Sequence, residues 1–195
     1  MTDAVKINYK ITKGNTFSET LRWESAEKIY KPITAITQSA PLTLTATAHG
    51  IPPQWRVKIT NVAGMTDINS SDTYRLGEPT TANLITINDI NSVGYRAYTS
   101  GGILEYNKPV DMTGYTAKLQ IRPNVDSSTL IYEMTTSNGG ITIDNTTKKI
   151  SLFIPATVTG TFNFTTAVYA MEIYAGTTSF VLIYGSMGLT KEVVK

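Results

Sequence analysis

Apolar and polar residues alternate along much of the chain, and this period of two is typical of half-buried β-strands. In residues 5–12 every second residue is apolar and the residues between them are polar. The same alternation recurs at Phe17, Leu21 and Trp23, at Tyr115, Ala117, Leu119 and Ile121, and at Ile150, Leu152 and Ile154. The pattern predicts a strand at each of these positions, with one face turned to a core.

Short polar segments separate the predicted strands, as turns do. They are KGN (13–15), SNGG (137–140), DNTTKK (144–149) and YAGTT (174–178). No segment repeats apolar residues at helical spacing, and only residues 25–30 and 155–160 have the composition for a turn or two of helix. We therefore predict an all-β fold.

Two nearly identical phrases divide the chain. IYKPI (29–33) and EYNKPV (105–110) enclose a stretch that is rich in threonine, asparagine, glycine and serine. A domain inserted into a hairpin loop must have its two ends close together, and loop tips tolerate such insertions. We therefore predict a discontinuous β-sandwich of residues 1–32 and 106–195, interrupted by a small β-barrel of residues 33–105.

The outer piece carries a series of short motifs in a fixed order. They are KGNTFSETLRW (13–23), KPVDMTGYTAKLQIR (108–122), GGITIDNTTKKISLFIPAT (139–157), AVYAMEIY (167–174) and GSMGLTKEVV (185–194). In this order they resemble the immunoglobulin-like proteins and N-terminal domains of tail, neck and baseplate genes of tailed bacteriophages. The resemblance implies an immunoglobulin-like sandwich in a virion structural protein.

The inserted piece resembles a different family. Its motifs are TATAHGIPPQWRVKITNVAGMTDIN (45–69), TYRL (73–76) and NLITINDINSVGYRAYTSGG (83–102). They are similar to the small β-barrel of the first catalytic-cysteine half-domain of ubiquitin-activating enzymes, a module that also occurs in phage structural proteins. The phage version often has glycine where this chain has Gln54. The ubiquitin reaction is not implied, because the chain has no cysteine.

Composition narrows the classes of function. The absence of cysteine excludes disulfides, thiolate zinc sites and cysteine nucleophiles. The formal net charge is only +2 and the basic residues are scattered, so we expect no nucleic-acid partner. The N-terminal residues lack the apolar core of a signal peptide, and the longest apolar run, FVLIY (180–184), is too short to span a bilayer. We expect no membrane partner.

The single histidine, His49, lies between two predicted strands and before Gly50. We interpret it as a turn residue, because no nearby pattern supplies the carboxylate and nucleophile that a catalytic histidine needs. Asp67, Asn69, Ser71 and Glu78 have nearly the spacing of a calcium loop. Asp72, however, stands where that loop requires glycine, so we predict a solvated loop and no metal site.

Other candidate residues point to contacts, not to catalysis. The carboxylates Asp111, Glu133, Asp144 and Glu172 are spread over several predicted strands, and no pair of them suggests glycoside hydrolysis. On the insert, Tyr95, Tyr98 and Tyr106 are candidates for exposed contacts, since aromatic rings stack on sugars. We predict no catalytic residue, no cofactor and no enzymatic activity.

The terminal segments 5–11 and 187–194 are candidate sheet edges, where a partner's strand could add to the sheet. The candidate edge residues are Val5, Ile7, Tyr9, Ile11, Leu189 and Val193. With the resemblances, this predicts a ring-forming or adaptor subunit of the phage neck, tail or baseplate. It would be made in the host cytoplasm and located in the virion, with copies of itself, other virion proteins and tail fibres as partners. The alternatives are a capsid decoration or head-fibre protein, and a carbohydrate- or receptor-binding module that uses the insert.

Overall fold

The structure is a computed structural model that describes residues 4–70 and 72–191. Strands dominate it, which confirms the prediction of an all-β fold. The chain divides into two compact units, a sandwich unit of residues 1–23 and 111–195 and an inserted unit of residues 24–110. The predicted discontinuous organisation therefore agrees with the structure, but the boundaries of the insertion differ.

The boundaries differ because the two connecting segments pair with each other. β4 (Glu24–Pro32) runs antiparallel to β10 (Ser100–Pro109), from the pair Pro32 and Ile103 to the pair Glu24 and Pro109. The predicted boundaries at 33 and 105 were wrong, because they assign β4 to the sandwich and residues 100–105 of its partner β10 to the insert. The helical alternative for residues 25–30 was also wrong, since these residues lie in β4.

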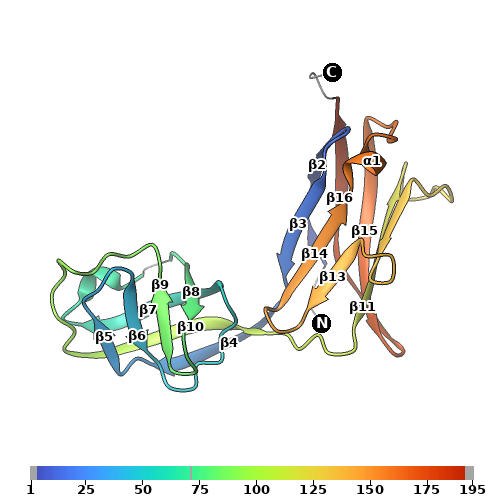
Figure 1. The fold of residues 1–195 in the computed structure, drawn as a ribbon. Coiled ribbons are helices and arrows are strands. Elements are labelled where there is room, and N and C mark those ends of the chain that lie inside the picture. Colours follow the sequence, from blue (N-terminus) through green and yellow to red (C-terminus); the bar gives the residue numbers. More distant parts are fainter. Residues whose placement is uncertain (1–3, 71, 192–195) are drawn as a thin grey trace. The chain divides into compact units, whose positions relative to one another are not determined.

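The inserted unit is a single curled sheet of seven strands in the order β4-β10-β7-β8-β9-β6-β5 (Figure 1). The other strands are β5 (Ala35–Thr37), β6 (Leu42–Thr45), β7 (Trp55–Ala63), β8 (Arg75–Pro79) and β9 (Leu84–Ile87). A short 3-10 helix, η1 (Thr66–Ile68), follows β7.

The two ends of this sheet meet where β4 continues into β5. The Ile33 N–H donates to the Gly102 carbonyl on β10, at 2.9 Å. The next residue, Thr34, donates its N–H to the Thr45 carbonyl on β6, also at 2.9 Å. Consecutive residues thus bond to opposite ends of the sheet, and the curled sheet encloses a core of its own. Its fully buried members include Leu42, Leu44, Trp55, Ile59, Met65, Ile85, Ile87 and Leu104.

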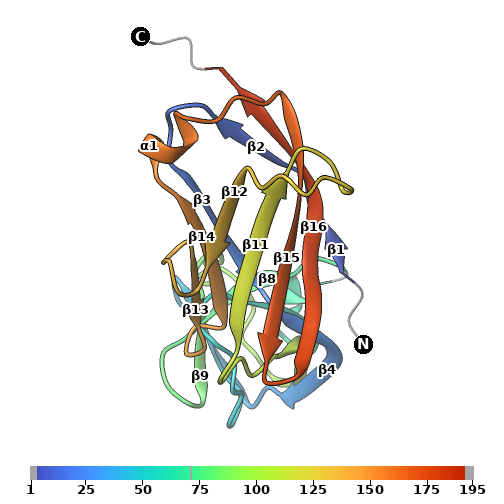
Figure 2. The ribbon, with the colours of Figure 1, turned by 90° about the vertical axis from the view of Figure 1, so that its right-hand side faces the viewer.

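The sandwich unit packs two sheets face to face (Figure 2). The large sheet has the order β1-β16-β15-β11-β12, with β2 also paired to β16. Its strands are β1 (Val5–Lys6), β2 (Tyr9–Thr12), β11 (Thr116–Arg122), β12 (Tyr132–Thr135), β15 (Thr166–Ala175) and β16 (Thr178–Thr190). The small sheet has the order β13-β14-β3, with strands Ile141–Asp144, Lys149–Ile154 and Phe17–Arg22.

Strand alternation supplies the core of the sandwich. Ala167, Tyr169, Met171 and Ile173 on β15 are buried, and so are the alternate residues of β11 and β14. Tyr9 packs edge-on against Phe17 from the small sheet, with ring centroids 5.4 Å apart. One helical turn, α1 (Ala156–Thr159), follows β14, in the segment 155–160 that had the composition for it.

The D-x-T-G-Y motif is where the chain re-enters the sandwich. The Asp111 carboxylate accepts hydrogen bonds from the Thr113 N–H (3.2 Å) and hydroxyl (2.8 Å), and from the Asn145 amide (2.8 Å). Asn145 lies in the turn between β13 and β14, and its amide oxygen accepts the Met112 N–H at 2.8 Å. The motif therefore ties the return of the chain to a turn of the small sheet.

These hydrogen bonds predict a pH-dependent contribution to stability. They hold the pKa of Asp111 at about 2, below its ordinary value of 3.8, with Lys148 a smaller cause. Because the pKa is lower in the folded state, the contribution is present above about pH 4 and is lost as the pH falls towards 2. We expect Asp111→Asn to lower the thermal midpoint at pH 6, and the gap to wild type to close between pH 4 and 2.

Thermal unfolding of both proteins across this pH range is the measurement. A gap that stays constant down to pH 2 would contradict the assignment. Asn145→Ala provides the control, because it removes the amide donor to Asp111. In that background, Asp111→Asn should have a smaller effect, as expected for residues that share one hydrogen-bond network.

Candidate functional site

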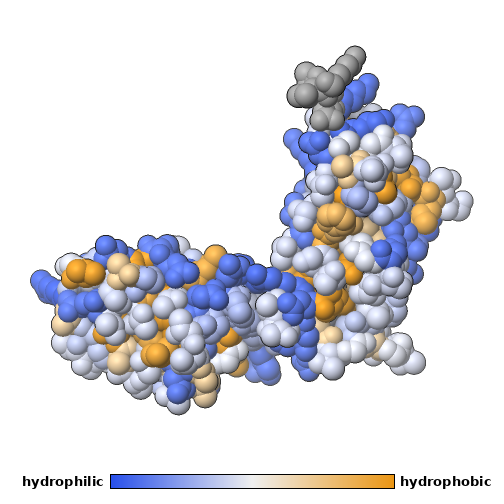
Figure 3. Space-filling view, in the orientation of Figure 1, coloured by the Kyte–Doolittle hydropathy of each residue, from blue (hydrophilic) through white to orange (hydrophobic). Residues whose placement is uncertain are grey.

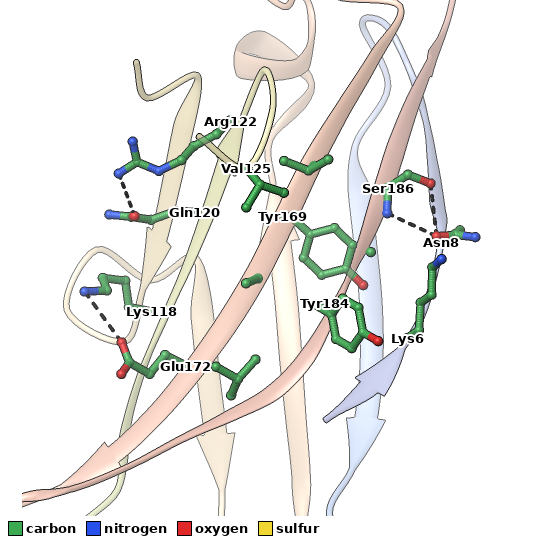
Figure 4. Close-up of a pocket in the computed structure, with 14 residues that line it drawn as sticks. Lys6, Asn8, Lys118, Gln120, Arg122, Val125, Tyr169, Glu172, Tyr184 and Ser186 are labelled. Carbon is green, nitrogen blue, oxygen red and sulfur yellow. Dashed lines mark hydrogen bonds and ion pairs between the residues drawn. The ribbon is translucent and has the colours of Figure 1, made fainter. Parts of the chain in front are cut away.

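A groove lies on the outer face of the large sheet, away from the sandwich core, and has a volume of about 670 Å³ (Figure 4). Polar side chains from β11 form one side of it, and Lys6 and Asn8 from the N-terminal segment form the other. Val168 and Ala170 on β15 and Val181 and Tyr184 on β16 line its apolar floor, and Val125 reaches it from the loop after β11. Its volume is in the range of ligand pockets in proteins.

In the described part of the chain, some of the charged side chains in the groove have ion-pair or hydrogen-bond partners and one does not. Lys118 lies 3.8 Å from Glu172, and Arg122 donates to the carbonyl oxygens of Ser127 and Ser128 at 2.9 Å. Lys6 has neither an ion pair nor a side-chain hydrogen bond within the described residues. The groove therefore has three cations to one carboxylate, and within the described residues the cation at its outer border has no charged partner.

The outer border of the groove is also an edge of the sheet. β1 and β2 pair in parallel with β16, from Val5 beside Ile183 to Thr12 beside Thr190. The N–H groups of Ile7 and Lys13 point to β16, where they donate to Tyr184 and Thr190. By the alternation of a strand, Lys6, Asn8 and Lys10 direct their main-chain groups to the opposite, open side. We call residues 5–12 the N-terminal edge.

The N-terminal edge is held to β16 by an irregular set of bonds at its centre. The Asn8 side-chain oxygen, 3.0 Å away in each case, accepts the Ser186 N–H and hydroxyl. The Tyr169 hydroxyl donates to the Ile7 carbonyl at 2.9 Å, and burial raises the pKa of this hydroxyl, which keeps its proton. In the gap between β1 and β2, the Asn8 side chain thus takes the place of a main-chain acceptor in the pairing with β16.

Gly185 makes this approach of the two strands possible. A Cβ atom on Gly185 would lie 1.8 Å from the Ile7 carbonyl oxygen, a separation that no side chain tolerates. Gly188 on the same strand has no such constraint, since its nearest neighbour would be 3.9 Å away. The backbone of β16 must therefore carry glycine at residue 185 for the N-terminal edge to dock.

The other edges of the sandwich are closed or short. On β12, the Asn138 side chain accepts the Thr135 N–H at 2.8 Å and donates to the Glu133 carbonyl at 3.0 Å, in the manner of a neighbouring strand. On β3, Glu19 pairs with the buried Leu152 and so points to the core side of an edge, an arrangement that opposes strand addition. β13 has only four residues.

Of the predicted edge residues, the structure brings Val5, Ile7, Tyr9 and Ile11 together on the N-terminal edge. Tyr9 and Ile11 are buried in the core, whereas Val5 is 57% exposed. Leu189 was wrongly assigned to an edge, because β16 at this point pairs with Ile11 of β2 and its N–H donates to Thr165 beside β15. Val193 lies outside the described residues.

The tyrosines predicted as exposed contacts are mostly part of the inserted core. Tyr106 is buried, and its hydroxyl donates to the His49 carbonyl, so its assignment as an exposed contact was wrong. Tyr95 and Tyr98 are half-buried against the core, and the Tyr98 hydroxyl lies 2.9 Å from the Gly101 carbonyl. On the face shown in Figure 3, hydrophobic residues lie in separate areas among hydrophilic ones.

His49 has the structural role that its sequence context indicated. It is buried, its Nδ1 accepts the Ile51 N–H at 3.2 Å, and its Nε2 lies 2.9 Å from the Thr81 carbonyl. These bonds assign the proton to Nε2. Gly50 and Ala48 beside it have positive φ angles, so the segment is a tight turn that the imidazole holds in place.

Nothing in the described residues assembles a metal site. No group of three or more histidine or acidic residues lies close enough to hold an ion within 4–70 and 72–191. Asn69, from the calcium-like sequence, instead accepts the Val62 N–H and donates to its carbonyl, at 2.8 and 2.9 Å. Ser71 of the same sequence lies outside the described residues.

In the part of the chain that the structure describes, no helix is long and apolar enough to cross a membrane.

Sequence reasoning missed the residues that shape the edges. Asn8, Asn138 and Gly185 are polar or small residues at turns and strand irregularities, and the sequence marked only Asn138, as part of the predicted turn SNGG (137–140). Comparison of the chain with family models and with curated proteins finds no match. The candidate site therefore rests on the geometry of the groove and the N-terminal edge.

Gly185→Ala should weaken the docking of the N-terminal edge. The added methyl group collides with the Ile7 carbonyl, and overpacking of this kind costs about 1–3 kcal/mol of unfolding free energy. Gly188→Ala is the matched control and should change that free energy by less than about 0.5 kcal/mol. Urea titrations of the two variants provide the comparison, and equal losses for both would refute the close contact.

Asn138→Ala should expose the edge of β12. Loss of its hydrogen bonds should lower the unfolding free energy by about 1 kcal/mol, and the open edge should promote association at high protein concentration. Asn124→Ala is the control, since Asn124 accepts a hydrogen bond only from its own loop. Sedimentation velocity over a concentration series measures the effect, and a variant that stays as monomeric as wild type would show that Asn138 does not protect the edge.

Proposed function

We propose that this chain is a non-enzymatic structural protein of a tailed-phage virion, a ring or adaptor subunit of the neck, tail or baseplate. It assembles by surface complementarity with copies of itself and with other virion proteins, including tail fibres. The ordered motifs of the sandwich unit support the phage assignment through their resemblance to neck, tail and baseplate proteins.

One structural observation carries the proposal of an assembly role. On the N-terminal edge, the outer main-chain groups of Lys6, Asn8 and Lys10 have no main-chain partner within the described residues, while Asn138 caps β12 and Glu19 points to the core side of β3. An open edge is costly for a protein that acts alone, because it invites unwanted pairing. An edge whose main-chain groups are not capped by a side chain, beside edges that are, remains available to a strand of a different partner.

The alternative of a carbohydrate- or receptor-binding module has less support. It relied on exposed tyrosines of the insert, and Tyr106 is buried while Tyr95 and Tyr98 pack on the core. Both tryptophans, Trp23 and Trp55, are buried as well. The exposed Tyr30 and Tyr74 remain, and Tyr74 is already engaged by Lys28, which donates to its hydroxyl, and by the Arg56 guanidinium, 5.5 Å from its ring centroid.

The proposal predicts that the chain is a stoichiometric component of purified phage particles. We would image particles carrying the intact chain and particles in which residues 24–110 are replaced by a short glycine-serine linker. We expect the same ring or collar in both, with density for the inserted unit missing from the second. The replaced segment follows the observed unit boundary, so the sandwich keeps all its strands.

Mass spectrometry of the same particles provides the decisive control. If the intact chain is absent from purified particles, the proposal of a virion structural protein fails. If the chain is present but the linker variant is not incorporated, the inserted unit, and not the sandwich edge, is what attaches the protein.

A further inference from the structure

We propose that the N-terminal edge accepts an acidic, extended segment of a partner protein as an added strand of the large sheet. This inference builds on the proposed assembly role and names the chemistry of the partner. The edge presents main-chain donors and acceptors at Lys6, Asn8 and Lys10, and the side chains of the same residues lie on the outer face of the sheet. A strand that pairs here therefore meets these three side chains directly.

The charge of the edge selects the partner. Lys6 and Lys10 are exposed, and no acidic residue occurs between Ala4 and Thr12. Lys118 and Arg122 in the adjoining groove add to the positive field, and Glu172 is the one carboxylate among the described residues that line the groove. Opposite charges on neighbouring strands stabilise a sheet and like charges destabilise it. The edge thus favours a strand with carboxylates.

The spacing of the lysines defines where those carboxylates lie. Lys6 and Lys10 are on the same face and are separated by about 13 Å along the strand, from four residues at about 3.3 Å each. A matching partner strand carries two acidic residues four positions apart, with a small polar residue between them opposite Asn8. Asn8 itself is held by Ser186, so its side chain is already fixed before a partner arrives.

The same charges oppose pairing between two copies of this edge. In an antiparallel pair centred on Asn8, Lys6 of one copy lies opposite Lys10 of the other, twice. Like charges placed directly opposite destabilise such a pair, and lysines on an edge are a common protection against self-association. In this register the edge therefore favours an acidic strand over its own copy.

Synthetic peptides and the full-length protein test this inference. The first peptide is an extended threonine- and valine-rich segment with glutamate at two positions four residues apart, and the second has lysine at those positions. A third keeps the glutamates but is N-methylated at alternate residues, which removes its pairing N–H groups. Amide chemical shifts of the isotope-labelled protein report where each peptide binds.

We expect the glutamate peptide to shift the amides of residues 5–12, and the other two peptides to bind at least tenfold more weakly. Lys6→Glu/Lys10→Glu should reverse the preference towards the lysine peptide, and Lys6→Gln/Lys10→Gln should abolish the preference. Lys31→Glu/Lys108→Glu makes the same change of net charge in the inserted unit and should leave binding unchanged. Unchanged spectra away from the substituted residues establish that each variant is folded.

A second, independent variant tests the register and charges without any peptide. Lys10→Glu places a carboxylate opposite Lys6 of a second copy, so the repulsion between two edges becomes attraction. We expect this variant to dimerise in sedimentation velocity experiments at concentrations where wild type is monomeric.

Several outcomes would overturn the inference. Equal binding of the N-methylated peptide would show charge attraction without strand pairing, and glutamate-peptide binding that survives Lys6→Glu/Lys10→Glu would place the site elsewhere. A wild-type dimer through this edge would make a second copy the occupant. Absence of the chain from phage particles defeats the proposed function but not the peptide result, whereas a failed peptide result with the chain present in particles defeats only this inference.

Discussion

Main-chain hydrogen bonding at the ends of sheets is the constraint on which this structure depends. Every sheet has two outer strands whose N–H and C=O groups need a partner, water or a protecting side chain. The inserted unit meets the constraint by curling until Ile33 and Thr34, neighbours in sequence, bond to its two ends. The sandwich has two open sheets, and its outer strands differ in how their main-chain groups are covered.

The side chains that cap the outer strands of the sandwich are single residues from neighbouring turns. Asn138 pairs with β12 through the two ends of one amide, and the same use of an amide recurs at Asn69 on β7 of the inserted unit. Asn8 also substitutes for a main-chain group, but it joins β16 to the N-terminal edge and leaves the outer side of that edge unprotected. An asparagine amide therefore caps the outer side of β12, whereas at the N-terminal edge it only fixes the strand to β16.

Sequence patterns predicted the strands well because burial of alternate residues is written directly in the order of side chains. The runs at Ala117–Ile121 and Ile150–Ile154 are buried at every second residue. The insertion was recognised from the repeated phrases at its two ends, but its boundary was misplaced. The segment ESAEKIYKP has no strong alternation, and its pairing with residues 100–109 is a long-range event that local pattern does not reveal.

The candidate site was harder to predict than the fold. The edge residues Val5 and Ile7 were found from alternation at the terminus, but Leu189 was assigned by proximity to the other terminus, although it lies inside the sheet. The tyrosines failed because an aromatic residue with a polar tip fits a core as well as a surface, and Tyr106 has its hydroxyl satisfied by His49. The groove combines residues from β1, β11, β15 and β16, and no single segment of sequence contains it.

The ladder between β4 and β10 has a mechanical consequence. Both connections to the sandwich leave the inserted unit at the same end of this ladder, next to the pair Glu24 and Pro109. Tension that reaches the insert through these connections acts on that terminal pair first and would separate the strands one rung at a time. The ladder is irregular there, with a shifted register between Asn107 and Pro109, and the exposed ion pair of Lys108 and Glu27 lies beside it. Under load the insert would begin to yield at this base, where the Arg56 guanidinium holds the Glu24 carboxylate at 3.0 and 2.7 Å, before the load reached its enclosed core.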